Sequence, residues 1–174
     1  MIHIRKATQK DVGLIFNLAK DIWPSAYLEI IGQAQVDYML DKMYNATELS
    51  KQMAEGHIFL IAEQHHQALG FAGFSLVDAE AHTYKLHKLY VLPETQGTGL
   101  GWKLVDEVLK FVRAVKGKTL LLNVNKFNKA RFFYEKLGFE IIEDVKIDIG
   151  GGFFMDDFVM EKKVEGVKVS ESKE

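Results

Sequence analysis

Residues 86–101 carry the pattern that most limits how this chain can fold. An apolar, strand-like run ends at Pro93, and three glycines then stand at every second position, Gly97, Gly99 and Gly101. A helical periodicity of apolar residues begins directly afterwards. The first turn of a helix has unpaired N–H groups, and glycine lets a ligand approach the backbone without a Cβ in the way. This succession of strand, glycine loop and helix favours an anion site, such as one for phosphate.

Two familiar phosphate loops fail on spacing. The dinucleotide pattern G-x-G-x-x-G begins at Gly97 and Gly99, but position 102 is Trp102. The P-loop pattern ends in residues 117–119 (GKT), but it needs a glycine where Val112 stands, and this stretch precedes a strand-like run instead of a helix. A plain turn needs one glycine. Three glycines within five residues therefore favour a phosphate cradle of another kind.

Composition narrows the class of protein. The 174 residues, 48% of them hydrophobic and 26% charged, fit one soluble globular domain. The net charge of −2 and the scattered lysines argue against nucleic acid or an anionic membrane as partner. The absence of cysteine excludes disulfides, thiolate metal sites and a cysteine nucleophile. A polar N-terminus and the lack of an apolar run of about 18 residues predict a cytoplasmic location.

The remaining patterns predict a mixed α/β domain. We expect strands at 2–6, 57–63, 68–77, 82–92, 119–124, 139–147 and 153–162. We expect helices from Thr8 to a limit at Pro24, and at 33–44, 47–55, 100–116 and 126–137. Turns are predicted at 63–67 and 150–152. This order predicts one sheet with helices on both faces in a single domain, 1–162, followed by a charged, flexible tail, 163–174.

A second motif follows the glycine loop by about 27 residues, in the segment 123–140 (NVNKFNKARFFYEKLGFE). With it, the chain resembles the GCN5-related N-acetyltransferases, the GNAT family. The family's loop motif [RQ]-x-x-G-x-[GA] is matched by Gln96, Gly99 and Gly101. Its second motif is matched by Asn128, with alanine two residues later, and by the run FYEKLGF at 133–139. The resemblance extends over residues 2–162.

The resemblance implies a fold and a cosubstrate. The fold is a single-domain, mostly antiparallel central sheet whose fourth and fifth strands splay apart. The cosubstrate is acetyl-CoA, with its pantetheine arm along the backbone of residues 89–91 and its pyrophosphate on residues 96–102. The cofactor-binding residues implied in this way are Leu89, Tyr90, Val91, Gln96, Gly97, Thr98, Gly99, Leu100, Gly101, Trp102, Asn128 and Tyr134.

Two side chains are candidates for the chemistry. Tyr134 matches the family's tyrosine, whose hydroxyl faces the CoA sulfur, and is the candidate acid for the leaving thiolate. His87 is the candidate base for the acceptor amine, because a histidine can take a proton at neutral pH. Strand alternation puts His87 on one face with Lys85, and Lys88 on the other. Glutamates in the first helices are substitutes for His87 in this role.

Other polar residues have weaker signals. His65 and His66 fall in a predicted turn with no second ligand pair nearby, so we predict no metal. Several acidic residues could draw a cationic amine toward the acceptor region, although a solvated rim is the favoured interpretation of them. They are Glu29, Asp37, Asp41, Asp148, Asp156 and Asp157.

The sequence thus predicts an acetyl-CoA-dependent N-acetyltransferase that acts by direct attack, without a covalent enzyme intermediate. The expected acceptor is a primary amine of a small molecule, such as a polyamine or amino compound. Acetylation of a protein N-terminus or lysine is an alternative, and so is a CoA-binding sensor without turnover. A homodimer is compatible with the sequence.

Overall fold

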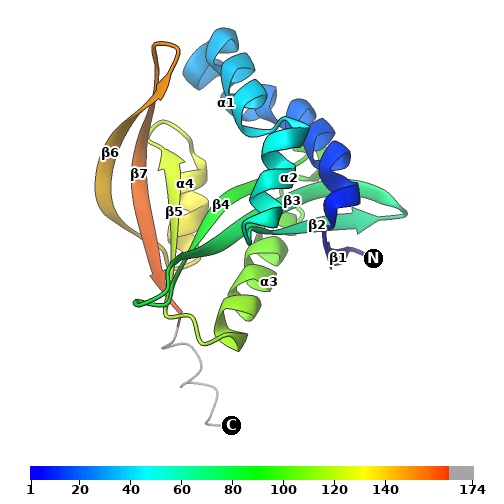
Figure 1. Cartoon of the computed structure of the whole chain (residues 1–174), viewed down its shortest axis with the longest axis vertical. Coiled ribbons are helices and arrows are strands. Elements are labelled where there is room, and N and C mark those ends of the chain that lie inside the picture. The colour runs from blue at the N-terminus through cyan, green and yellow to red at the C-terminus, as the bar shows by residue number, and fades with distance from the viewer. Residues whose placement is uncertain (165–174) are drawn as a thin grey trace. The chain divides into compact units, whose positions relative to one another are not determined.

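The computed structural model describes residues 1–164, shown in Figure 1. Its strands are β1 (His3–Lys6), β2 (Ile58–Gln64), β3 (Gln67–Asp78), β4 (Thr83–Val91), β5 (Thr119–Asn125), β6 (Glu140–Gly150) and β7 (Phe153–Lys163). Its α-helices are α1 (Val12–Met43), α2 (Ala46–Ala54), α3 (Leu100–Ala114) and α4 (Ala130–Lys136). Single 3-10 turns, η1 (Gln9–Asp11) and η2 (Pro93–Thr95), precede α1 and the glycine loop. No helix in the described residues is both long enough and apolar enough to span a membrane.

The strands form one seven-stranded mixed sheet in the order β1-β2-β3-β4-β5-β7-β6. Strand β1 is antiparallel to β2, β2 to β3, β5 to β7 and β6 to β7, whereas β4 and β5 are parallel. The β4–β5 register pairs Thr83–Leu86 with Thr119–Leu122 and ends there, although β4 has nine residues. This short register agrees with the predicted separation of the fourth and fifth strands. The mixed α/β class and the mostly antiparallel sheet are confirmed.

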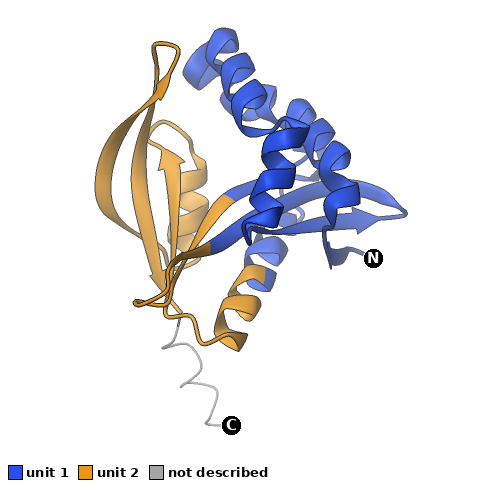
Figure 2. Cartoon of the chain, in the orientation of Figure 1, with its two compact units in different colours: residues 1–75, 88–107 blue, residues 76–87, 108–174 orange. Residues whose placement is uncertain are grey.

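The chain divides into two compact units, coloured in Figure 2. One consists of residues 1–75 and 88–107, and the other begins with residues 76–87 and resumes at residue 108. Strands β3 and β4 and helix α3 contribute to both. The first unit has a core of large side chains that are less than 2% exposed: Ile15, Tyr44, Leu49, Phe59, Ile61, Phe71, Phe74, Leu100 and Leu104. In the second, the core residues include Val112, Leu120, Leu122, Phe139, Met160 and Val164.

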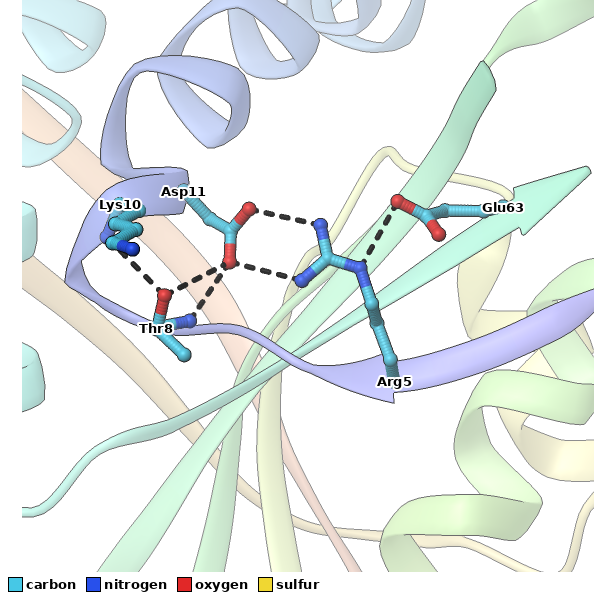
Figure 3. A network of polar contacts seen from close by, with 5 residues as sticks. All are labelled: Arg5, Thr8, Lys10, Asp11 and Glu63. Atoms are coloured by element: carbon cyan, nitrogen blue, oxygen red, sulfur yellow. Dashed lines mark hydrogen bonds and ion pairs between the residues drawn. The ribbon is translucent and has the colours of Figure 1, made fainter. Parts of the chain in front are cut away.

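A polar network fixes the start of α1 to the sheet in the first unit (Figure 3). The Arg5 guanidinium on β1 donates to both carboxylate oxygens of Asp11, at 3.0 and 2.8 Å, and to Glu63 on β2 at 3.0 Å. Asp11 also accepts from the Thr8 amide at 2.8 Å, which completes a capping box. The hydrogen bonds from Arg5 lower the pKa of Asp11 to about 2. The helix start expected at Thr8 is confirmed.

The expectation that Pro24 limits the first helix is wrong. Helix α1 continues past Pro24 and kinks at Gly32, where φ is 82° and ψ is 163°. Proline removes one N–H donor, but the buried side chains of Ile22 and Trp23, 3% and 2% exposed, hold this stretch of the helix in the core. Only glycine adopts the Gly32 conformation readily, so the break falls there.

The second unit is built around β5 and the long hairpin of β6 and β7, visible in Figure 1. Strand β7 runs to Lys163, and the buried Val164 donates its amide to Lys118 at 2.9 Å, so the structured part extends two residues beyond 162. Residues 165–174, which make up most of the expected tail, lie outside the described residues. Helix α4 begins only at Ala130 and ends at Lys136, so it is shorter than the expected 126–137.

The two predicted turns are confirmed. His65 and His66 connect β2 to β3 with φ of 53° and 64°, the left-handed conformation of a two-residue hairpin turn. Gly150, Gly151 and Gly152 connect β6 to β7, and all three have positive φ. Glycine is needed in the second turn because three successive left-handed residues would strain any other side chain.

Gly70 of β3 lies close against β4 and gives a test of the fold. A Cβ at Gly70 would lie 2.7 Å from the Tyr90 carbonyl oxygen and 2.9 Å from Val91 Cγ1. Gly70→Ala should therefore lower the free energy of unfolding by about 1–3 kcal/mol, because strand backbones must move apart. Gly13→Ala in α1 is the matched control: nothing lies within 4 Å, and alanine should raise stability by up to about 1 kcal/mol. Equal effects of both variants in urea unfolding would contradict this packing.

Candidate functional site

The glycine loop connects β4 to α3 within the first unit. Gly97 and Gly99 have φ of 84° and 85°, and a Cβ at either would meet nothing within 4 Å. Residues 96–99 are exposed, whereas Leu100 is buried and anchors the start of α3. The first hydrogen bond of the helix runs from the Lys103 amide to the Gly99 carbonyl at 3.0 Å. Both glycines are therefore required by conformation, and the space beside them is open.

The amides of this loop differ in what they can offer a ligand. The Gln96 amide donates to Pro93 and the Thr98 amide to Thr95, each at 3.2 Å, so the turn itself uses these two groups. The amides at the first turn of α3, from Leu100 to Trp102, have no intrahelical acceptor and lie at the positive end of the helix dipole. The arrangement can hold an anion through main-chain N–H groups, with the helix start as its main contributor.

Strand β4 leads into this loop through residues 89–91, which are half-buried. The chain leaves β4 with the Leu92 amide bonded to the Leu69 carbonyl of β3 at 2.8 Å. The Tyr90 side chain joins an aromatic cluster of the first unit, and its hydroxyl lies 3.0 Å from the Tyr27 hydroxyl. The rings of the cluster, with centroids 4.6–6.2 Å apart, are Trp23, Tyr27, Tyr44, Phe71 and Tyr90.

Lys88 on β4 is a buried cation that the sequence patterns did not single out. Its residue is 8% exposed, its Nζ donates to Gln52 Oε1 of α2 at 3.0 Å, and the same Nζ lies over the rings of Tyr44 and Phe59. Burial lowers the pKa of Lys88 to about 8, with the charge of Glu48 acting in the opposite direction. Burial, followed by the charge of Lys88, also lowers the pKa of His57. Alternation did predict that Lys88 faces away from His87.

Tyr134 and Asn128 lie at the two ends of the α4 region in the second unit. Tyr134 is 8% exposed, and its ring packs edge-on against Phe133 and Phe139. The Asn128 side chain accepts from the Ala130 amide at 2.8 Å, after a turn in which the Asn128 amide donates to Asn125 at 3.0 Å. Because this turn occupies residues 125–128, α4 begins only at Ala130. Asn128 therefore has a structural task that is separate from any contact with a cofactor.

His87 is half-buried, one position beyond the last β4 residue of the β4–β5 register. Directly paired residues point to the same face of a sheet, as do residues two apart on one strand. Lys85 is paired with Leu121, and Asn123 with Val159, so this face carries Lys85 and His87 from β4, Asn123 from β5 and Asp157 from β7. The structure thus brings polar side chains of three strands to one face around the candidate base.

Asp157 corrects the expectation of a solvated acidic rim. Asp148 is exposed, and Asp156 forms an ion pair with Lys126 at 3.1 Å with its side chain 40% exposed. Asp157 is only 3% exposed, and its Oδ2 accepts from Asn123 Nδ2 at 3.4 Å. Burial raises its pKa. Glu29, Asp37 and Asp41 are exposed in the first unit, as expected.

Sequence reasoning could not find the burial of Lys88 and Asp157. Each is a charged residue within a strand whose pattern allows either face, and a lysine or aspartate is normally exposed. Apolar residues flank both Asp156 and Asp157 at alternate positions of β7, so no signal in the sequence shows which of the two is buried. Among residues 1–164, no three His, Asp or Glu side chains come together as a metal site.

Comparisons with known proteins agree with the fold described above. Residues 55–141 match the family described as acetyltransferase (GNAT) domain. The chain is 26% identical to a spermidine N(1)-acetyltransferase of Thermoplasma acidophilum, over 94% of this chain and 98% of that protein. It is 30% identical to a 5-NmdU N-acetyltransferase of Pseudomonas phage PaMx11, over 81% and 89%. A crystal structure of the PaiA N-acetyltransferase from Thermoplasma acidophilum in complex with coenzyme A matches with a TM-score of 0.79 at 25% identity, over 94% and 99%.

The buried Lys88 predicts a specific pH dependence of stability. A lysine whose pKa is about 8 when folded and 10.5 when unfolded binds protons more tightly in the unfolded state, so stability rises with pH between these values. In Lys88→Met this contribution is absent. Relative to the variant, the wild-type free energy of unfolding should rise by about 2 kcal/mol between about pH 7.5 and 10. Parallel pH profiles of the two proteins in urea unfolding would show that the ammonium is not buried.

Proposed function

The chain belongs to the GNAT acetyltransferase family and is an N-acetyltransferase, and from this we propose that it transfers the acetyl group of acetyl-CoA to a primary amine of a small molecule. The observation that carries the proposal is the loop of residues 96–102, where glycines with positive φ lead into the first turn of α3. An anion the size of a pyrophosphate fits such backbone, because no Cβ stands in its way.

The residues present fit coenzyme A, and both its pyrophosphate and its pantetheine arm have candidate partners. The pyrophosphate would be held by Gln96, Gly97, Thr98, Gly99, Leu100, Gly101 and Trp102, chiefly through the amides at the start of α3. The pantetheine arm would add to the backbone of Leu89, Tyr90 and Val91, beyond the point where the β4–β5 register ends. Asn128 and Tyr134 would complete the cofactor contacts. When bound, acetyl-CoA supplies an activated acetyl thioester.

The proposed transfer needs no covalent enzyme intermediate. The acceptor arrives as an ammonium and loses one proton to His87, directly or through water, which gives the nitrogen a lone pair. The nitrogen then attacks the thioester carbonyl, and the carbon–sulfur bond breaks. Tyr134 donates its phenolic proton to the departing thiolate and recovers one from the new amide nitrogen. The products are the N-acetyl amine and free coenzyme A.

A small cationic amine is the favoured acceptor. The support is the relative named spermidine N(1)-acetyltransferase, which aligns over nearly the whole of both chains at 26% identity. A protein N-terminus, a protein lysine and CoA sensing without turnover are the alternatives, and a panel of polyamines, amino acids, peptides and protein acceptors distinguishes them by the release of coenzyme A thiol.

The cradle is tested at Gly99. Gly99→Ala adds a Cβ where a phosphate would approach the backbone, so we expect the acetyl-CoA Kd in calorimetry to rise at least about tenfold, or roughly 1.4 kcal/mol. Gly56→Ala is the matched control, because Gly56 also has positive φ (103°) and open space around its Cβ position. Both variants should lose similar stability from backbone strain. Equal acetyl-CoA affinity in the two variants would refute the cradle.

The acid role is tested by Tyr134→Phe, which keeps the ring packed against Phe133 and Phe139. We expect kcat to fall about 100-fold, since the loss of a positioned acid costs two or more orders of magnitude, while the acetyl-CoA Kd changes less than about twofold. Tyr84→Phe is the control, a half-buried tyrosine of the same unit that packs against Phe111. An unchanged kcat in Tyr134→Phe on a good acceptor would remove Tyr134 from the chemistry.

A further inference from the structure

Asp157 is the one buried carboxylate among residues 1–164, with 3% of its surface exposed. It lies on β7, opposite Asn125 of β5 and Val145 of β6, in the middle of the second unit's sheet. A buried carboxylate normally has close and complete hydrogen bonding, because removing its charge from water is costly. The partners of Asp157 therefore decide whether its place in the sheet is structural or serves a ligand.

The hydrogen bonding around Asp157 is incomplete. Its bond from Asn123 Nδ2 is long, at 3.4 Å, compared with about 2.9 Å for an ordinary N–H···O contact. The other end of the same amide, Asn123 Oδ1, is buried without a hydrogen-bond partner among the described residues. An amide oxygen without a donor and a carboxylate with one long hydrogen bond thus stand together on one face.

The charges around Asp157 support the same conclusion. Lys85 of β4 acts on the carboxylate through its charge, as does Lys126, while Asp156 opposes them. A satisfied ion pair would lower the pKa of Asp157 and raise that of Lys85. Here burial raises the pKa of Asp157 and lowers the pKa of Lys85, so desolvation exceeds their mutual attraction. Lys85 does not fully compensate the carboxylate.

We propose that Asp157 and Asn123 bind an ammonium group of the acceptor amine, which gives this acetyltransferase its preference for cationic acceptors. This inference rests on the proposed function. An ammonium has three N–H donors, and here it meets one carboxylate and one amide oxygen on adjacent strands. Charge-assisted bonds of this kind are about twice as strong as neutral ones. Asp157 and Asn123 are positioning residues, and proton transfer stays with His87.

The location of the pair fits this role. Asn123, Lys85 and His87 are half-buried, so the polar side chains that share this face with Asp157 are partly exposed to solvent. His87 lies on the same face, two residues along β4 from Lys85. An amine held at the pair would therefore be bound on the face that carries the candidate base. A carboxylate at this position would also repel anionic acceptors.

Asp157→Asn tests the proposal, with Asp156→Asn as the matched control. We expect Asp157→Asn to raise the KM for 1,4-diaminobutane at least tenfold, with a smaller change in kcat and an unchanged acetyl-CoA Kd. Asp156→Asn, which alters the neighbouring exposed carboxylate, should leave the KM, the kcat and the acetyl-CoA Kd unchanged. In the wild type, KM should rise as pH falls through the range in which Asp157 gains a proton, and this rise should be lost in Asp157→Asn. A KM within twofold of the wild type would overturn the proposal.

Folding does not confound this test. A carboxylate whose pKa is raised on folding is less favourable in the folded state above that pKa, so Asp157→Asn should keep or increase stability at neutral pH. Asn123→Leu removes the orphaned oxygen and should also raise KM. A large loss of stability in Asp157→Asn, without a change in KM for Asn123→Leu, would show a structural role instead.

A second measurement separates this proposal from the proposed function. The side-chain amide signal of Asn123 in NMR should shift when 1,4-diaminobutane is added, with or without acetyl-CoA, and the shift should be absent in Asp157→Asn. Diamine binding without acetyl transfer would leave the site in place and overturn the proposed function. Acetyl transfer to diamines with an unchanged Asn123 signal would overturn the site and leave the function.

Discussion

The parallel pairing between β4 and β5 lasts for only four residue pairs, Thr83–Leu86 with Thr119–Leu122, and the organisation of the site depends on this limit. Beyond Leu86 the strand continues for five residues, to Val91, and leads into the glycine loop and α3. A strand that leaves its neighbour can offer main-chain groups to an extended ligand, as in strand addition to a sheet edge. The same strand places His87 at the point of departure and Lys88 on the opposite face.

Within residues 1–164, the sheet contains two buried charged residues, one in each unit, whose burial costs stability. Lys88 is packed over Tyr44 and Phe59 with one hydrogen bond to Gln52, and Asp157 has one long hydrogen bond to Asn123. Burial disfavours the charged form of both, so neither is explained as a source of stability. Perturbed groups of this kind concentrate at functional sites. For Asp157, the unpartnered amide oxygen of Asn123 supports the proposed ammonium site, whereas Lys88 packs against the rings of Tyr44 and Phe59.

Local sequence rules predicted those parts of the fold that short-range interactions determine, such as turns and helix caps. The glycine loop and the turn at 150–152 could be predicted, because glycine adopts the positive φ found at 97, 99 and 150–152 more easily than other residues. The capping box at Thr8 could be predicted because it is a short-range pattern. The path of α1 past Pro24 could not be predicted from local rules, because it depends on the packing of Ile22 and Trp23 in the core. The side on which Asp157 lies depends on the register of β5 and β7, which pairs residues 32 or more apart in the chain. The buried amide oxygen of Asn123 has no sequence signal at all.

The most direct test of the proposed cofactor site is a backbone-amide NMR titration of the chain with coenzyme A. We expect the largest chemical-shift changes at the amides of Gly97–Trp102, where the pyrophosphate would rest, and along Leu89–Val91, where the pantetheine arm would lie. Small changes in both segments, or saturable changes confined to other parts of the sheet, would contradict the assignment of β4 and its loop as the cofactor site.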